Sequence, residues 1–428
     1  MSGDIENLVQ KLVFQKDAKI RKEIRKRAEA QGVFVCSTQK LYEARVQNQW
    51  ENLTVPAINI RTLTFDTARS IFRQVIKKKV GAFIFELARS EISYTDQDMS
   101  EYVPVILAAA IKEGFRGPLF FQGDHFQANA KKYFNPEKKE EEVSALKKLI
   151  KDSIEAGVYN IDIDTSTLVS LEKPDIKEQQ KYNSLLTAEL TSYIRSLQSQ
   201  GITISVGGEV GEIGGRNSIP EDIRVFMEEY NKHLLELKIK PGLIKIAVQT
   251  GATHGGVVLP SGEIKKVEID FNTLRKLSEE VRKFSMAGAV QHGASTLPEE
   301  YFDEFPKTGA IEIHLATAFQ NIVYDFMPES LREKIYDWLK KDYNPPAIRT
   351  PLAVNPVSEE KEEILTQEQF LYKARKKALG PFKKEIWSIP EENKDKIAQV
   401  LEEKFSILFE KLGVINSLEL IKKYYPFN

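Results

Sequence analysis

The clearest pattern along the chain is a series of short apolar runs, rich in β-branched residues, that end in glycine, serine, threonine or another polar residue. Runs of this length and composition are typical of buried strands. We expect eight strands, at VPAINI (55–60), AFIFEL (82–87), PLFFQG (118–123), NIDIDT (160–165), TISVGG (203–208), LIKIAV (243–248), AGAVQH (287–292) and IEIHLA (311–316).

Between the strands, apolar residues recur with the period of a helix. Such stretches include 65–79, 141–157, 188–201 and 271–284, and several close with Lys or Arg shortly before Gly, as helix ends do. Eight alternations of strand and helix predict an α/β protein with a (β/α)8 TIM barrel. An open doubly wound sheet is the alternative, and we favour the barrel.

The barrel does not account for the whole chain. We expect an N-terminal helical extension (1–50), a TIM-barrel catalytic domain (51–330) and a C-terminal helical segment (331–428) that serves as a cap or in oligomerisation. A loop is expected across the proline-containing stretch 344–360. The basic run 19–27 is expected to be the solvated face of a helix rather than a nucleic-acid patch.

The composition of the chain limits the classes of function that it could have. Lys and Arg number 61 against 62 Asp and Glu, a formal charge of -1, so no overall basic field indicates nucleic acid or an anionic membrane as partner. No segment approaches the roughly 20 apolar residues of a membrane span. The single cysteine, Cys36, excludes an intramolecular disulfide and a cysteine-rich zinc module. We expect a cytoplasmic protein whose metal ligands, if any, are His, Asp or Glu.

Histidines gather at one predicted rim. His125 follows the third strand, His254 lies beyond the sixth, His292 closes the seventh and His314 lies within the eighth, whereas His233 falls in a helical stretch. In a TIM barrel, reactive groups come from the C-terminal ends of the strands. Imidazoles from separate strands can converge on one divalent ion, with zinc as the default and cobalt, iron or manganese as alternatives. The competing interpretation is a set of unrelated hydrogen-bonded residues.

Carboxylates and small residues join the same rim. The acids are Asp124, Asp162, Asp164, Glu209 and Glu212, which could act as metal ligands, as their partners or as proton carriers. The small residues are Gly255, Gly256, Gly293, Ser295, Thr296 and Thr317. Glycine amides and hydroxyls suit a phosphate, and phosphate sites after strands seven and eight recur in barrels, although these glycines could also be plain turn residues.

The ordered motifs resemble the metal-dependent, class II fructose-bisphosphate aldolase family, which includes tagatose-bisphosphate aldolases. The resemblance spans about 55–325. Besides the opening strand VPAINI, it rests on QGDH (122–125), IDIDTS (161–166), GGEVGEIGG (207–215), TGATHGG (250–256) and QHGAST (291–296). Each motif is weak alone, and the set in this order is specific.

The resemblance implies roles for individual residues. His125, His254 and His292 would bind the catalytic metal, with Glu209 as an additional or alternate ligand. Asp124 would be the acid/base at the aldehyde oxygen. The residues implied to hold the phosphate of dihydroxyacetone phosphate, together with a monovalent cation, are Gly255, Gly293, Ser295 and Thr317.

The chain departs from the family at two places that bear on chemistry. The loop RNSIPEDIRVF (216–226) is shorter than the family's acidic loop. We expect Glu212, Glu221 or Asp222 to exchange the proton on the enediolate carbon, although Glu221 and Asp222 are also ordinary first-turn helix residues. The family's Asn-x-Asp-Thr on strand eight becomes His314-Leu315-Ala316-Thr317, so His314 is expected to contact the substrate.

These observations predict a metal-dependent aldolase. It would cleave a phosphorylated ketose, by default fructose 1,6-bisphosphate, into dihydroxyacetone phosphate and an aldehyde through an enediolate whose charge the metal stabilises. The alternatives are a metal-dependent epimerase or isomerase of a sugar or sugar acid, a non-catalytic aldolase-like partner subunit, and a Schiff-base mechanism on Lys245. We also expect a homo-oligomer, a dimer or a tetramer.

Overall fold

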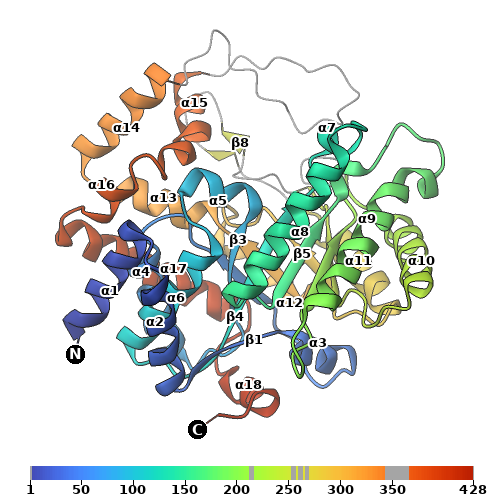
Figure 1. Cartoon of the computed structure of the whole chain (residues 1–428), viewed down its shortest axis with the longest axis horizontal. Coiled ribbons are helices and arrows are strands. Elements are labelled where there is room, and N and C mark those ends of the chain that lie inside the picture. Colours follow the sequence, from blue (N-terminus) through green and yellow to red (C-terminus); the bar gives the residue numbers. More distant parts are fainter. Residues whose placement is uncertain are drawn as a thin grey trace.

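The computed structural model describes residues 2–211, 216–251, 257–258, 264–265, 269–342 and 366–427. Its centre is a closed barrel of eight parallel strands surrounded by helices (Figure 1). Barrel closure comes from the pairing of the last strand with the first, in which His314 lies opposite Ala57. The chain therefore has the predicted (β/α)8 TIM-barrel fold.

Each predicted strand is present, with ends shifted by a few residues. The barrel strands are β2 (Val55–Asn59), β3 (Ile84–Ala88), β4 (Gly117–Gln127), β5 (Asn160–Asp164), β6 (Ser205–Glu209), β7 (Lys245–Val248), β10 (Ala289–Gln291) and β11 (Glu312–Leu315). Two further short strands, β8 (Val257–Val258) and β9 (Ile264–Lys265), form an antiparallel pair outside the barrel. Parallel strands buried on both faces explain why the sequence shows continuous apolar runs rather than alternation.

The helices around the barrel include the four stretches singled out from sequence, and the third of these begins earlier than predicted. They are α4 (Thr64–Lys78), α5 (Arg89–Thr95), α6 (Met99–Glu113), α7 (Ala130–Tyr133), α8 (Lys139–Ala156), α9 (Ile176–Leu197), α10 (Pro220–Leu237), α11 (Phe271–Lys283), α12 (Glu304–Thr308) and α13 (Thr317–Phe326). Side chains of Asp98, Asp175 and Asp270 accept backbone N–H groups and thereby begin α6, α9 and α11. None of the described helices combines the length and apolar character needed to cross a membrane.

The N-terminal region contains one element that the sequence analysis missed. After α1 (Ser2–Gln15) and α2 (Ala18–Ala30), the strand β1 (Val33–Cys36) pairs in parallel with the start of β4, and α3 (Gln39–Val46) follows. The expectation of helices alone across 1–50 was therefore wrong at β1. The basic run lies on α2, which buries Ile20, Ile24 and Ala28 on one side, as expected for a solvated basic face.

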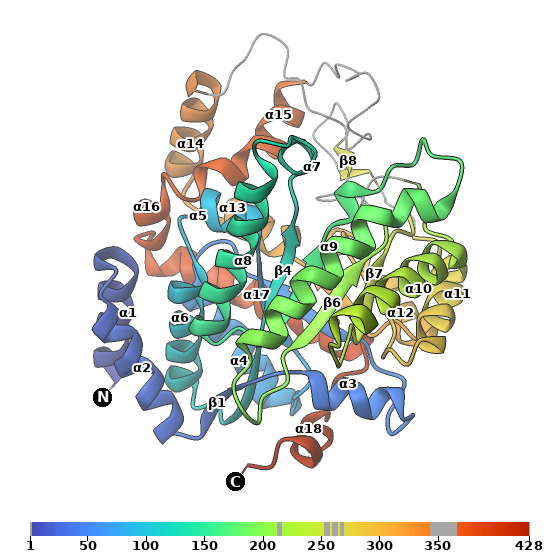
Figure 2. The same ribbon diagram turned by 45° about the vertical axis from the view of Figure 1, so that its right-hand side comes forward.

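The C-terminal region reaches both ends of the barrel (Figure 2). It comprises α14 (Glu329–Asp342), α15 (Gln367–Ala374), the 3-10 helix η3 (Arg375–Ala378), α16 (Lys383–Trp387), α17 (Glu391–Lys411) and α18 (Leu418–Tyr424). Helix α17 packs on α4 and α13, and η3 packs on α5 beside the barrel mouth. At the opposite end, the Ser417 hydroxyl accepts the amides of Gly81 and Ala82. The stretch 344–360 lies outside the described residues.

Candidate active site

A bulge in β4 builds the centre of the site. Successive residues of a regular strand point to opposite faces, yet Asp124 and His125 contribute to one cluster. The pairing of β4 with β5 shifts register between Gly123 and Phe126, and His125 has φ of +40°, in the left-handed region. A Cβ at Gly123 would lie 2.3 Å from Cζ of Phe126, so glycine is required there. Such local strain is found at functional sites.

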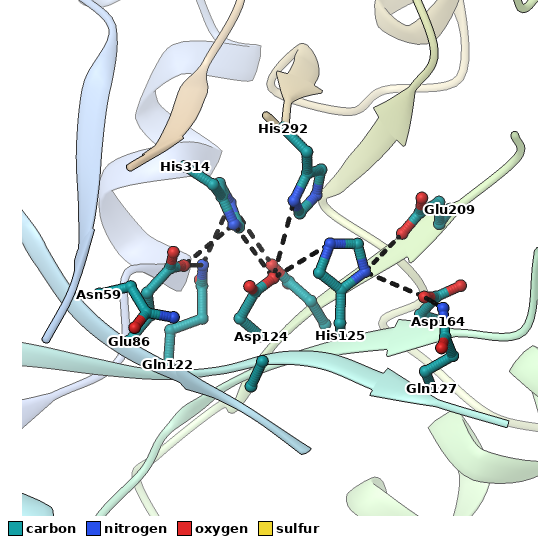
Figure 3. A network of polar contacts seen from close by, with 12 residues as sticks. Asn59, Glu86, Gln122, Asp124, His125, Gln127, Asp164, Glu209, His292 and His314 are labelled. Carbon is teal, nitrogen blue, oxygen red and sulfur yellow. Dashed lines mark hydrogen bonds and ion pairs between the residues drawn. The ribbon is translucent and has the colours of Figure 1, made fainter. Parts of the chain in front are cut away.

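Three imidazoles stand in a row above this bulge (Figure 3). The ring centroids of His125 and His292 are 4.1 Å apart, and those of His292 and His314 are also 4.1 Å apart. Asp124 lies below the row, with Oδ1 3.8 Å from Nδ1 of His292 and 3.1 Å from Nδ1 of His314. Residues far apart in sequence therefore converge at the C-terminal ends of β4, β10 and β11, as the sequence predicted for this rim.

On its other side, His125 meets two carboxylates. Its Nδ1 lies 2.9 Å from Oδ2 of Asp164 and 3.2 Å from Oε2 of Glu209. Burial and the nearby charge of Asp164 raise the pKa of Glu209 to about 8. Asp164 is differently placed: burial would raise its pKa, but hydrogen bonds from His125, Ser166 and Gln127 lower it below the ordinary value. Asp164 is therefore held as an anion, and Glu209 beside it gains a proton more easily.

The donor set fits a divalent metal. Ligand atoms of Asp124, His125 and His292 lie within 4.8 Å of one another, and so do those of His125, Asp164 and Glu209. Mixed imidazole and carboxylate donors on rigid strands are suitable ligands for zinc and its first-row neighbours. The third expected histidine ligand, His254, lies outside the described residues.

His314 connects the metal donors to a buried acid. Its Nδ1 lies 3.0 Å from Oε2 of Glu86, and its Nε2 lies 3.1 Å from Oε2 of Glu312. Burial, followed by the charge of Asp124, raises the pKa of Glu86 to about 7. Burial would lower the pKa of His314, but Glu86 and Asp124 hold it well above the usual value. The His314 imidazole therefore lies in contact with carboxyl groups from three strands, those of Glu86, Asp124 and Glu312.

Lys245 is held inside the barrel by oxygen acceptors. Its ammonium donates to Oε1 of Gln122 at 2.6 Å and to Oδ2 of Asp162 at 3.0 Å, and it also pairs with Glu312. Burial lowers the pKa of this lysine, but Asp162 and Glu312 outweigh burial and raise it. A Schiff-base nucleophile must be a neutral amine, so this geometry favours a structural charge and not the Schiff-base alternative.

The remaining residues predicted from sequence are distributed as follows. Gly293, with φ of +71°, and the buried Ser295 follow β10, and Thr317 begins α13. Glu212 and Gly255 lie outside the described residues. Asp222 accepts two hydrogen bonds from Arg216, at 2.8 and 2.6 Å, and one from the amide of Ile219. This geometry favours the first-turn helix interpretation of Asp222 over the catalytic one.

Sequence reasoning missed three residues of the site: Glu86, Glu312 and Arg61. Glu86 and Glu312 are fully buried acids within apolar strands, and Arg61 follows β2 at the mouth. The sequence does contain a signal for Glu86 and Glu312, because charged residues inside a buried strand are rare unless they are paired. Which carboxylates lie beside Lys245 on other strands depends on the barrel register, which the sequence does not give.

Solved structures support the fold. Fructose-bisphosphate aldolase from Campylobacter jejuni shares 17% identity at a TM-score of 0.50, with 89% of this chain and 96% of that chain covered. The YdjI aldolase from Escherichia coli shares 12% identity at a TM-score of 0.51, with 89% and 98% covered. Fructuronate-tagaturonate epimerase from Cohnella laeviribosi shares 12% identity at a TM-score of 0.57, with 84% and 81% covered.

Sequence comparison identifies the family. A search of the curated proteins finds no match. The family model described as fructose-bisphosphate aldolase class-II matches residues 39–407, which include every barrel strand, the β4 bulge and the histidine row. The chain belongs to the class II fructose-bisphosphate aldolase family.

Proposed function

We propose that the protein is a metal-dependent aldolase. It reversibly cleaves a phosphorylated ketose, with fructose 1,6-bisphosphate as the default substrate, into dihydroxyacetone phosphate and an aldehyde. The observation that carries the proposal is the position of Asp124, whose carboxylate lies beside the imidazoles of His125 and His292. An acid/base group next to a metal donor set is the minimum that this bond cleavage needs.

Metal binding in this proposal uses His125, His292 and His254, with Glu209 as an additional or alternate ligand. Zinc is the proposed metal. When bound, a divalent cation would supply Lewis-acid stabilisation of the negative charge that develops on the two adjacent substrate oxygens. Asp164 orients His125 through its Nδ1, which is the role that carboxylates commonly have beside metal-binding histidines.

Asp124 is the proposed acid/base. Burial would raise its pKa, but His125 and His314 lower it well below the ordinary value, so the group is a carboxylate that can accept a proton. In the cleavage direction, the proton of the C4 hydroxyl passes to Asp124, and the electron pair left on that oxygen forms the second bond of the aldehyde carbonyl. The C3–C4 bond breaks, and its electron pair becomes the enediolate of dihydroxyacetone phosphate.

The proton that completes dihydroxyacetone phosphate needs a second donor. Glu212 is the proposed donor, because the Asp222 carboxylate is bound by Arg216 and by the amide of Ile219. Gly255, Gly293, Ser295 and Thr317 are proposed to hold the phosphate of this product. The proposal further includes a homo-oligomer, which size-exclusion chromatography with light scattering tests directly.

An epimerase of a sugar or sugar acid is the second candidate. The pair of Glu86 and His314 supports it, because these protonatable groups lie in contact beside Asp124 and could supply additional proton transfer. A non-catalytic partner subunit is the weakest alternative, since Asp124, His125 and His292 are all retained and converge.

A cleavage assay separates the candidates. Metal-loaded protein is incubated with fructose 1,6-bisphosphate, and dihydroxyacetone phosphate is measured by NADH-coupled reduction. A parallel incubation with an unphosphorylated ketohexuronate is followed by chromatography for an epimer. The aldolase proposal expects release of the triose phosphate that chelator abolishes. Epimer formation without cleavage of any phosphorylated ketose would support the second candidate instead.

A further inference from the structure

The N-terminal extension closes the end of the barrel that lies opposite to the site. Figure 2 shows α3 at the lower end of the barrel, next to α18. The backbone N–H and the hydroxyl of Thr38 donate to Oδ1 of Asn160 on β5, at 2.7 and 2.8 Å. The indole of Trp50 donates to the carbonyl of Leu41 at 2.8 Å. These contacts attach the start of α3 firmly to the barrel.

Tyr42, on α3, reaches from this end into the barrel. Its side chain is fully buried, and its hydroxyl donates a hydrogen bond to Oε1 of Glu312, the first residue of β11. Burial and the charge of Glu312 hold the pKa of Tyr42 well above its usual value, so the hydroxyl keeps its proton and remains a donor. The N-terminal extension therefore supplies a polar group to the barrel interior.

The two oxygens of Glu312 have different partners. Oε1 accepts the Tyr42 hydroxyl, whereas Oε2 pairs with the ammonium of Lys245 and lies 3.1 Å from Nε2 of His314. Burial would raise the pKa of Glu312, but Lys245 and His314 lower it to about 2, so the group is an anion. Because groups on different elements bind the two oxygens, the carboxylate cannot rotate without losing one of these contacts. Glu312 is thus held in one orientation.

The contacts continue from Glu312 to the proposed acid/base. Glu312 and His314 are two residues apart on β11, so both side chains point to the same face of the strand. The two ring nitrogens of His314 lie beside different carboxylates, with Nε2 beside Glu312 and Nδ1 3.1 Å from Oδ1 of Asp124. Rotation of the imidazole would break both contacts. The orientation of the ring, and with it that of Asp124, therefore depends on where Glu312 is held.

We infer that Tyr42 is a positioning residue for the proposed reaction, and that it acts through Glu312 and His314 on the carboxylate of Asp124. The inference rests on the proposed function only in taking Asp124 as the acid/base. A hydroxyl that did no more than satisfy a buried oxygen would contribute to stability alone. A hydroxyl that also sets the direction of this carboxylate contributes to the rate, because a misplaced base slows proton transfer. The two roles differ in what removal of the hydroxyl changes.

Tyr42→Phe removes the hydroxyl and keeps the ring, and Tyr425→Phe is its matched control. The Tyr425 hydroxyl donates to the carbonyl of Ser37 and accepts the amide of Leu41, so it holds the same segment without being a donor to Glu312. We expect Tyr42→Phe to lower kcat about tenfold, with KM, metal content and the kcat of Tyr425→Phe each within about twofold of wild type. An unchanged kcat in Tyr42→Phe, or equal losses in the two variants, would overturn the inference.

A double-mutant cycle with His314→Ala tests the route. If Tyr42 acts through His314, its hydroxyl should matter little once the imidazole is absent. We therefore expect Tyr42→Phe to change kcat by less than about twofold in the His314→Ala background. A full tenfold loss in that background, so that the two effects multiply, would show that Tyr42 does not act through His314.

The link can also be observed without any reaction. The chain has five histidines, so isotopic labelling of histidine nitrogen in zinc-loaded protein gives few ring signals in NMR spectra. The signal of His314 is the one that His314→Gln removes. We expect this signal to shift in Tyr42→Phe and to stay in place in Tyr425→Phe, and no shift in Tyr42→Phe would overturn the inference. A shift in a protein that cleaves no phosphorylated ketose would support the link from Tyr42 to His314 and count against the proposed function instead.

Discussion

Asp124 and His314 face each other at the barrel mouth, with Oδ1 of the carboxylate 3.1 Å from Nδ1 of the imidazole. The same nitrogen lies 3.0 Å from Oε2 of Glu86. A base held by a charged, buried neighbour keeps one orientation and loses little freedom when substrate binds. His314 therefore takes part in the site by orienting Asp124, besides any contact with substrate.

Replacing His314 with Ala should lower kcat about a hundredfold, because Asp124 loses the partner that holds it. His314→Gln, which keeps a hydrogen-bond donor, should recover part of that loss. Metal content, measured by plasma mass spectrometry, should stay at the wild-type value in both variants. Loss of metal in His314→Ala would instead make His314 a metal ligand.

Metal removal should abolish activity, and the histidine variants should reproduce that effect. His125→Ala and His292→Ala are each expected to lose bound metal and to lower kcat/KM by at least about a thousandfold. His233→Ala, on α10, is the matched control and should retain both metal and activity. Full activity in metal-depleted protein, or in both variants, would refute metal catalysis.

Lys245→Met should lower the free energy of unfolding. We do not expect Lys245 to behave as a catalytic nucleophile. The change leaves Asp162 and Glu312 buried without their ammonium, and breaking a buried pair in this way costs about 3–5 kcal/mol. Denaturant unfolding measures the loss, with Lys384→Met as the surface control. Borohydride reduction of wild type with substrate should leave Lys245 unmodified, and a stable adduct there would restore the Schiff-base mechanism.

The sequence predicted the barrel because its strands are buried on both faces and so leave continuous apolar runs. It placed Asp124, His125 and His292 at one rim because parallel strands end together. It did not place Glu86 or Glu312, because which interior side chains meet depends on barrel register. It also missed β1 (Val33–Cys36), which pairs with β4 but is not one of the eight barrel strands that alternate with helices.

The pH dependence of Cys36 modification tests how the N-terminal region packs. Burial raises the pKa of its thiol to about 12, so at pH 8 only about one molecule in ten thousand carries the reactive thiolate. Modification by a disulfide reagent should be slow in native protein, and its rate should rise about tenfold per pH unit between 7 and 10. Because the pKa of this thiol is raised in the folded state, the protonated thiol contributes to stability below pH 9. That contribution is lost as the pH rises toward 12. Equal modification rates in native and unfolded protein at pH 8 would contradict this burial.

The most direct measurement of the central claim is proton exchange of dihydroxyacetone phosphate in deuterium oxide, followed by NMR with and without a chelator. It isolates the half-reaction at the enediolate carbon and does not depend on which aldehyde is the second product. We predict stereospecific exchange of one hydrogen that depends on metal and that a chelator stops. Absence of exchange by fully metal-loaded protein would contradict the aldolase proposal and favour the epimerase or partner-subunit alternatives.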